Sequence, residues 1–507
     1  MRNRRRKSPG LILLFLFAVA CGGLAWRRGA GIENREEAIA IGDKAQLFVD
    51  DHVIETATGV HRQAHEAEKY FPNPVLTYTR PWEGHCVITW GSVLYDQSEH
   101  RFKIWYEAIR EDPGAGEETY FLYATSPDGI YWDKPELNQF EFQGSRANNI
   151  VFHPTAPFDS AVVIRDESDP IPDQRYKMMY YLRTKSTAER GLYGAVSRDG
   201  IHWRELHGPL VKAGDRSSFF YNRFRKTYVF MSRPGVPAPA TGVTRWIGIW
   251  ESGDFRSFGI MQPTLWPDAE DAVGTEFYSM QPFTYESLAL GYLEMFYAGE
   301  NDSRYRRLDT QLTISHDGRK WERALDRHPF LEFGPIGSWD GGWVCPASNA
   351  PIRRGDKLYI FYQGRRTFHW ATRPAQFEQD GETYQINDPA VGHVGSIGLA
   401  FLRIDGFASL DAGNTSGVVI TKPLVLPPGQ DLFVNANIQG TLKVSVLDEA
   451  GSPLSGYEAS ACLPLFGDSV SHRVQWQRGR DLRPLTGHTV RLRFDLSDAQ
   501  LYSFAVR

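Results

Sequence analysis

The 507-residue sequence predicts an all-β protein, with a five-bladed β-propeller followed by a small C-terminal β-sandwich. Three observations lead to this prediction. A turn phrase recurs along the chain, a strand phrase precedes each copy of it, and no stretch has the period of a long amphipathic helix. The aromatic content of 13% suits sheets, and the hydrophobic content of 42% can supply a large core. We expect two domains in a chain of this length.

The turn phrase is Ser-x-Asp-Gly-x-x-Trp, which occupies residues 126–132, 197–203 and 315–321. Each copy follows an alternating apolar run. The Asp-Gly pair supplies the positive φ that a tight hairpin turn requires, and the Trp begins the return strand. Two degenerate copies lie at 252–258 and 403–407. We therefore interpret the phrase as a marker of repeated hairpins and assign it no chemistry.

The strand phrase has the form Tyr-Lys-aliphatic-aromatic and precedes each marker. Its five copies are 101–106, 175–181, 227–231, 292–297 and 357–362. Successive units lie roughly 45 to 90 residues apart and contain several short strands each, which is typical of propeller blades. The predicted blades are 72–135, 148–206, 209–260, 262–324 and 330–410.

Residues 1–21 predict an export signal. Five Arg and Lys residues within 2–7 precede the apolar run 11–20, and the small residues at 18–20 suit a signal peptidase. Cys21 follows directly, so the site also resembles a relaxed lipobox in which Cys21 would carry a lipid and attach the protein to a membrane. Lipidation, plain cleavage and an uncleaved anchor remain open. Each implies an exported protein of the periplasm, cell envelope or extracellular space.

Without residues 1–20, which carry five positive and no negative charges, the formal net charge of −5 becomes −10. Nucleic acid is therefore not an expected partner. The remaining three cysteines have no metal-ligand spacing. Cys86 and Cys345 hold similar positions in the first and fifth predicted blades. We expect both to be small buried residues of inner strands, and a disulfide between them is the alternative.

The order of domains follows from composition. Residues 22–44 predict a linker, 45–410 the propeller and 411–507 the sandwich. Within the propeller segment, 45–55 predicts a strand that closes the ring by covering the free edge of the last blade; alternatively, Asp50 and Asp51 lie in the functional site. The C-terminal domain is expected to pack on the propeller, and carbohydrate binding is its alternative role.

An acid stands just before each predicted inner strand. In a propeller these strands converge on the central axis and form the floor of one pocket. Carboxylates gathered there repel one another, so some must have raised pKa values or pair with His85 and Arg216. When the pKa values of two carboxyl groups differ in this way, one group can act as an acid and the other as a base. The structural alternative is that these acids cap strand entrances. The five acids are Glu83, Asp159, Asp215, Glu276 and Asp340.

Aromatic and basic residues accompany these acids. Tyr278 and Trp343 could stack on a sugar ring. The loops after the second strands carry charged residues that would set specificity, among them Glu107, Arg183, Arg233 and Arg365. Several arginines at the opening of one pocket favour a substrate with carboxylate or sulfate groups. We expect no cofactor and identify no set of metal ligands, although the carboxylates could hold a structural Ca²⁺ ion.

Taken together, the five repeats, the marker turns, the segment 73–76 and the acids on inner strands resemble the five-bladed propeller glycoside hydrolases, the superfamily of arabinanases, β-xylosidases, invertases and levanases. The resemblance covers about 73–410. It implies cleavage at an anomeric carbon by two carboxyl groups, one donating a proton and the other activating water or attacking directly.

We expect Asp159, Asp215 and Glu276 to be catalytic. Glu276 is the expected general acid, because its apolar neighbours Val273 and Phe277 could raise its pKa. Asp159 or Asp215 would then be the base or nucleophile. Glu83, His85, Arg216, Tyr278, Asp340, Trp343, Arg183 and Arg233 are the expected substrate-binding residues.

Three alternatives remain open. The markers are also similar to sialidase Asp-boxes, which leaves a sialidase-like enzyme. A non-catalytic carbohydrate-binding propeller of the cell envelope is the second, since fold does not fix function. A scaffold protein is the third. Hydrolysis of a glycan separates the enzymes from the other two.

Overall fold

The computed structural model describes residues 37–112, 116–239, 241–371, 373–379 and 381–507, and Ala38–Arg507 forms one compact unit. The expected export signal and Cys21 lie outside the described residues. The described chain is all-β, as predicted, with no α-helix and therefore no helix that is long and apolar enough to cross a membrane. Short 3-10 turns are η1 (Pro81–Glu83), η2 (Pro172–Gln174), η3 (Leu325–Arg327), η4 (Gln477–Gly479) and η5 (Arg483–Leu485).

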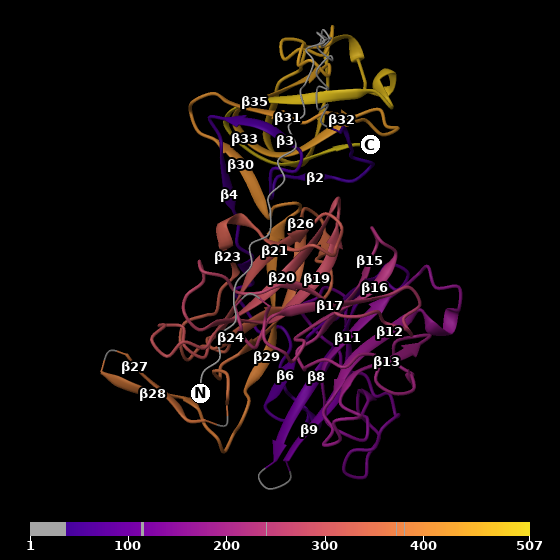
Figure 1. Ribbon diagram of the computed structural model, residues 1–507, viewed down its shortest axis with the longest axis vertical. Helices are drawn as coiled ribbons and strands as arrows, with labels where there is room; N and C mark the ends of the chain where they lie inside the picture. The colour runs from indigo at the N-terminus through magenta and orange to yellow at the C-terminus, as the bar shows by residue number, and fades with distance from the viewer. Residues whose placement is uncertain (1–36, 113–115, 240, 372, 380) are drawn as a thin grey trace, which may run out of the picture. The chain divides into compact units, whose positions relative to one another are not determined.

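Apart from one separate hairpin, the strands between residues 68 and 403 lie in one 15-stranded and two four-stranded sheets, which we divide by antiparallel pairing into five sets (Figure 1). Two of these strands, at 150–152 and 262–265, pair with the set before the predicted repeat that contains them. The first set contains β6 (Cys86–Ile88), β7 (Val93–Asp96), β8 (Arg101–Asp112), β9 (Gly116–Ser126) and β10 (Ile150–Phe152). The second contains β11 (Phe158–Arg165), β12 (Tyr176–Leu182), β13 (Gly191–Ser197) and β14 (Arg204–Glu205). The third contains β15 (Ser218–Asn222), β16 (Thr227–Ser232), β17 (Ile247–Ser252) and β18 (Gln262–Leu265).

The fourth set contains β19 (Thr275–Tyr285), β20 (Leu288–Tyr297), β21 (Leu308–Ser315), β22 (Glu322–Arg323) and β23 (Pro329–Leu331). The fifth contains β24 (Trp343–Pro346), β25 (Ile352–Arg354), β26 (Lys357–Arg365), β29 (Gly395–Arg403) and β5 (Glu68–Lys69). A separate hairpin, β27 (Ala375–Gln379) with β28 (Glu382–Asn387), lies between β26 and β29 in the chain.

Each set contacts the next one in the chain, and the fifth contacts the first. The contacts are a hydrogen bond from Ala161 N to Glu107, an ion pair of Asp159 with Arg216, a hydrogen bond from Phe277 N to Arg245 O, and single parallel bridges of Leu308 with Trp343 and of Cys86 with Gly395. The order of contacts therefore closes on itself.

The predicted turns are confirmed in the three full copies of the marker. Gly129, Gly200 and Gly318 have φ of +81°, +77° and +68°. In the second copy Oδ1 of Asp199 accepts hydrogen bonds from the backbone N of Ile201 at 2.8 Å and of His202 at 2.9 Å. The two degenerate copies differ, because the positive φ falls there on Phe255 and Asp405.

The markers also join neighbouring sets, which the sequence did not indicate. The Gly200 carbonyl accepts a hydrogen bond from Trp105 Nε1 in the first set at 2.6 Å, and a Cβ on Gly200 would lie 2.5 Å from the Trp105 ring. Asn222 of the third set donates to the Asp317 carbonyl in the marker of the fourth set at 2.8 Å. Each of these turns therefore packs against the preceding set.

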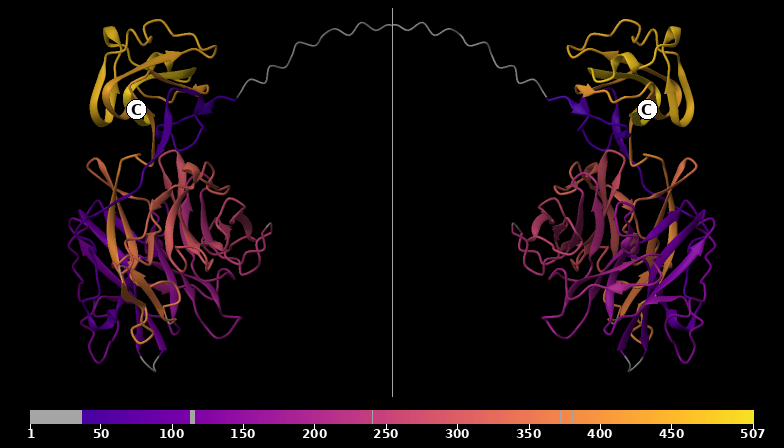
Figure 2. Two further views of the ribbon diagram at one scale, coloured as in Figure 1. Left: turned by 90° about the vertical axis from the view of Figure 1, so that its left-hand side faces the viewer. Right: turned by 90° about the vertical axis from the view of Figure 1, so that its right-hand side faces the viewer.

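The strand predicted at 45–55 does not close the ring. Its residues split between β2 (Gln46–Leu47), which pairs with β35, and β3 (Ile54–Thr58), which pairs with β31. Figure 2 shows these indigo strands among the C-terminal strands. The reason is burial: Phe48 is fully buried against Phe494 and Phe504. Instead, β5 pairs with the edge of β29.

A further sheet therefore joins both ends of the described chain. Its strands are β1 (Ile39–Ala40), β2, β3, β4 (His61–Ala64), β30 (Ala408–Ala412), β31 (Gly417–Thr421), β32 (Leu424–Val425), β33 (Leu432–Leu447), β34 (Leu465–Val474) and β35 (Thr489–Val506). The strands β2, β3 and β4, which the predicted boundaries placed in the propeller segment 45–410, and β1, which they placed in the linker 22–44, belong to this sheet by their pairing.

Candidate functional site

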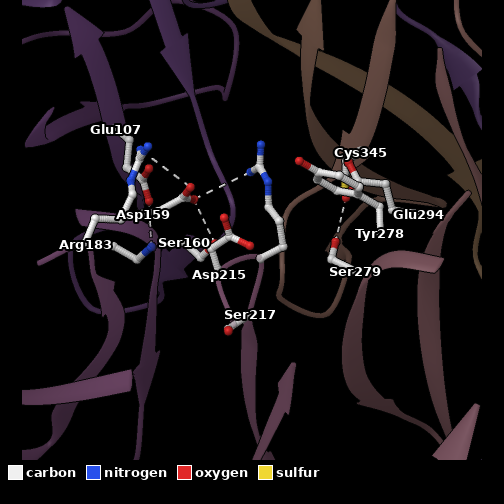
Figure 3. A network of polar contacts seen from close by, with 12 residues as sticks. Glu107, Asp159, Ser160, Arg183, Asp215, Ser217, Tyr278, Ser279, Glu294 and Cys345 are labelled. Atoms are coloured by element: carbon white, nitrogen blue, oxygen red, sulfur yellow. Dashed lines mark hydrogen bonds and ion pairs between the residues drawn. The ribbon is translucent and has the colours of Figure 1, made fainter. Parts of the chain in front are cut away.

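Three of the five predicted acids lie in one group of charged residues, which we call the arginine–carboxylate cluster. Figure 3 shows two of them, Asp159 and Asp215. Asp159 is in β11, Asp215 precedes β15 and Glu276 is in β19. The cluster also contains one further acid and five arginines, and two tryptophans and a tyrosine pack among them. These members are Glu107, Arg183, Arg216, Arg233, Arg245, Arg365, Trp90, Trp343 and Tyr278.

Asp159 is held between two guanidinium groups. Its Oδ2 lies 3.6 Å from Arg183 Nη2, its Oδ1 lies 3.6 Å from Arg216 Nη1, and it accepts a hydrogen bond from Ser160 Oγ at 2.9 Å. Burial alone would raise the pKa of Asp159, but Arg216 and then Arg183 hold this pKa below its ordinary value. Asp159 is therefore an ionised carboxylate, and 13% of its side chain is exposed.

Glu107 lies in β8 and is buried, so it is not the rim residue that its position in the sequence suggested. Its Oε1 accepts a hydrogen bond from Ala161 N at 2.6 Å, and Figure 3 shows its carboxyl group beside that of Asp159. Burial, followed by the negative charge of Asp159, raises the pKa of Glu107 well above its usual range. The two carboxyl groups thus come from neighbouring sets and favour opposite protonation states.

Asp215 and Glu276 each pair with an arginine. Asp215 forms an ion pair with Arg233, and Glu276 forms one with Arg245 and accepts a hydrogen bond from Thr244 Oγ1 at 3.1 Å. The apolar environment that we expected around Glu276 is absent on one side, because Val273 is 95% exposed. Glu276 therefore lacks the apolar surroundings on which its expected role as the general acid depends.

Tyr278 lies at the centre of the arginines. Its ring centre is 5.1 Å from the guanidinium carbon of Arg216, 4.8 Å from that of Arg233 and 5.7 Å from that of Arg245. Its hydroxyl group lies 2.7 Å from His369 Nε2. Burial, and then the charge of Arg245, hold the pKa of His369 far below its ordinary value, so the imidazole is neutral.

Trp343 forms part of the floor of the cluster. It is 2% exposed, and its Nε1 donates a hydrogen bond to the buried Glu294. Its faces contact Arg365 at 4.1 Å and Arg216 at 4.6 Å. The ring is therefore covered by guanidinium groups and does not present the open stacking surface that we expected for a sugar.

The other expected residues have partners outside the cluster. Glu83 is fully buried and accepts hydrogen bonds from Thr79 N, Arg80 N, Tyr106 OH and Lys134 Nζ. Asp340 pairs with Lys69 at 2.6 Å. These two carboxylates are occupied by structural donors, as the strand-capping alternative proposed. His85 is exposed, and its ring contacts Tyr78.

Two remaining expectations concern metals and thiols. Within the described ranges, no group of three or more His, Cys, Asp or Glu side chains is arranged to hold a metal ion. Cys86 and Cys345 are free and buried, so the disulfide alternative is wrong. Asp50 pairs with His316 at 2.7 Å and Asp51 pairs with Arg62, which places neither in the cluster.

No protein-family model matches the chain, and neither does any curated protein. Among solved structures, it is similar to an N-acetylgalactosamine deacetylase from F. plautii in complex with blood group B trisaccharide (15% identity, TM-score 0.42), with 68% of this chain and 96% of that chain covered. It is also similar to a β-1,2-mannobiose phosphorylase from Listeria innocua in complex with β-1,2-mannobiose (15% identity, TM-score 0.46, coverage 68% and 98%). A glycosyl hydrolase from Bacteroides ovatus matches at 15% identity and a TM-score of 0.43, with coverage of 67% and 94%.

Proposed function

We propose that this chain is a glycoside hydrolase built on a five-bladed β-propeller, and that it cleaves an oligo- or polysaccharide at the arginine–carboxylate cluster. The observation that supports this most is the pair Asp159 and Glu107. Arginines hold the pKa of Asp159 low, while burial raises the pKa of Glu107. Neighbouring carboxyl groups whose pKa values are driven apart supply the base and the acid that glycoside cleavage requires.

In this proposal Asp159 is the ionised carboxylate that activates water or attacks the anomeric carbon. Glu107 is the proton donor, because Oε1 already accepts the Ala161 amide and Oε2 is left to carry the proton. Asp215 and Glu276, which pair as carboxylates with Arg233 and Arg245, would orient the sugar. The five guanidinium groups favour a sugar with an anionic group.

The test is turnover on a panel of neutral and anionic oligosaccharides, with release of reducing ends as the readout. Wild-type protein is expected to release product from at least one member, and Asp159→Asn is expected to release none above background. Binding of a sugar without product, unchanged in Asp159→Asn, would instead identify a non-catalytic carbohydrate-binding protein.

We also propose that the protein is exported and that Cys21 carries a lipid. Labelling cells with radioactive palmitate checks this, with Cys21→Ser as the control. Equal label in both proteins would exclude Cys21 as the attachment site.

A further inference from the structure

Two arginines from different sets share one aromatic floor. The guanidinium carbon of Arg216 lies 3.4 Å from the centre of the Trp90 ring and 4.6 Å from that of Trp343. The guanidinium carbon of Arg365 lies 4.1 Å from the centre of Trp343 and 5.7 Å from that of Trp90. Arg216 is 6% exposed and Arg365 is 1% exposed. Two cations are therefore buried against the same pair of rings.

Three nitrogen atoms of these two side chains lack hydrogen-bond acceptors. Nε and Nη2 of Arg365, and Nη1 of Arg216, are buried and donate to no acceptor in the described part of the chain. At 3.6 Å, Asp159 is an ion-pair partner of Arg216 but lies beyond hydrogen-bonding distance. Aromatic faces recover part of the free energy lost when a guanidinium leaves water, but they do not replace its acceptors.

The other three arginines of the cluster are paired. Arg183 pairs with Glu117, Arg233 pairs with Asp215 and Arg245 pairs with Glu276. Nε of Arg183 is also buried without an acceptor, but Arg183 keeps its ion pair with Glu117. In the described part of the chain, Arg216 and Arg365 are thus the two of the five that have no carboxylate within hydrogen-bonding distance.

Arg216 and Arg365 also have few negative charges near them to balance their own. Asp159 is shared with Arg183. Glu294 already accepts hydrogen bonds from Ser279 Oγ at 2.7 Å and from Trp343 Nε1, and burial raises its pKa. Glu111 pairs with His393 at 3.1 Å. An anion placed between the two guanidinium groups would therefore supply both the missing acceptors and the missing charge.

We infer that Arg216 and Arg365 form a subsite for one anionic group, a carboxylate or a sulfate, on the sugar that the cluster binds. This inference rests on the proposed function and narrows its substrate to acidic or sulfated glycans. The fork of N–H groups on a guanidinium matches both anions. The exposed fraction of the side chains rises from 7% for Arg216 to 13% for Asp159 and 41% for Asp215, so the cluster is most accessible to solvent at Asp215.

The test measures binding of D-glucuronate and of inorganic sulfate to the full chain by titration calorimetry, with D-glucose as the neutral control. Wild-type protein is expected to bind at least one anion and not glucose. Arg365→Gln and Arg216→Gln are expected to weaken that binding at least tenfold. Arg198→Gln, which removes an arginine with a 78% exposed side chain, is the control for a lost charge and should bind as wild type does. The stronger of the two probes decides between carboxylate and sulfate.

A second measurement separates a binding role from a structural one. Without added anion, Arg365→Gln is expected to have a Tm equal to or above that of wild type, because it removes a buried cation that lacks acceptors. A lower Tm with unchanged anion affinity would assign Arg365 to packing and overturn the inference. If Arg216→Gln does not fold, Arg365→Gln and Arg365→Lys still carry the test.

The two proposals can fail separately. Anion binding that depends on both arginines, without cleavage of any glycan, would contradict the hydrolase and leave the subsite standing. Cleavage of neutral glycans, with anion affinity unchanged in Arg365→Gln and Arg216→Gln, would overturn the subsite alone.

Discussion

Oε1 of Glu107 accepts a hydrogen bond from the backbone N of Ala161 at 2.6 Å, and this contact fixes a buried acid against the strand that carries Asp159. The register of β11 shifts between Asp159 and Val162, and Ser160 there has a φ of 58°. Bulges of this kind redirect a side chain and leave an amide free to bond outside the sheet. The same irregularity therefore aims the Asp159 carboxylate and supplies the donor for Glu107.

Removing the charge of Asp159 should remove activity. For Asp159→Asn we expect kcat/KM to fall by about 10²–10⁴, the usual contribution of a positioned acid or base. Asp173→Asn, which alters a carboxylate of the same set with a 73% exposed side chain, is the matched control and should keep full activity. Activity above half of wild type in Asp159→Asn would contradict our assignment of this residue.

The dependence of kcat/KM on pH should reflect the protonation states of Asp159 and Glu107. The working form has Asp159 ionised and Glu107 protonated, so kcat/KM should rise with pH through the lowered pKa of Asp159 and fall through the raised pKa of Glu107. Both apparent pKa values belong to the coupled pair. Glu107→Gln should lose the alkaline fall and should cleave aryl glycosides with good leaving groups better than it cleaves natural glycans. An unchanged alkaline limb in this variant would exclude Glu107 as the donor.

Glu83 should matter for stability and not for the site. Glu83→Gln leaves Lys134 buried without its carboxylate, and breaking a buried ion pair costs about 3–5 kcal/mol. Glu99→Gln breaks a pair with Lys103 whose acid is 54% exposed, and should change stability by less than about 1 kcal/mol. Urea unfolding midpoints compare the two. A Glu83→Gln protein as stable as wild type would show that this carboxylate does not hold its turn together.

The marker turns should depend on contact between sets as well as on backbone conformation. Gly200 and Gly208 both have positive φ, but a Cβ on Gly208 meets nothing within 4 Å, whereas a Cβ on Gly200 meets Trp105. We expect Gly208→Ala to cost about 1–2 kcal/mol from conformation alone and Gly200→Ala roughly 1–3 kcal/mol more from the clash. Thermal unfolding measures both variants, and equal losses would mean that the Trp105 contact contributes nothing.

Phe48 tests the pairing of the chain ends. Its side chain is fully buried in the C-terminal core, so Phe48→Ala should destabilise that sheet by about 3–5 kcal/mol. Phe71 is fully exposed, and Phe71→Ala should have no effect. The readout is hydrogen exchange in β33 and β35, which should speed up in the first variant only. Slow exchange in both variants would place Phe48 outside the core that stabilises these strands.

Features that depend on interactions between residues close in the sequence could be predicted, whereas features that depend on distant residues could not. The marker turns were predictable, because the Asp199 carboxylate bonds to amides only two and three residues away. In the sequence, Glu83 and Asp340 precede their predicted inner strands as Asp159 does, yet their partners Lys134 and Lys69 lie 51 and 271 residues away along the chain. No local pattern distinguishes a carboxylate that will meet such a partner from one that remains in the site.

Glu107 illustrates the same limit. In the sequence, Glu107 stands between the apolar residues 104–106 and 108–109. A charged side chain in such a strand is seldom fully buried unless it has a partner, so this position was the one indication of a special role. Its burial, however, depends on β11 of the next set. The strand at 45–55 failed for a different reason, since an alternating pattern fits either sheet equally well and only the packing of Phe48 decides between them.

The pairing of β3 with β31 places a constraint on how the molecule forms. During synthesis the five sets emerge between these two strands, so at about 5–20 residues per second β3 stays without its neighbour for tens of seconds. An unpaired strand edge of that lifetime invites association with other chains, and it needs protection by a chaperone or by rapid docking of its apolar residues elsewhere. Because β31 is made so long after β3, this sheet would be the last part of the protein to fold.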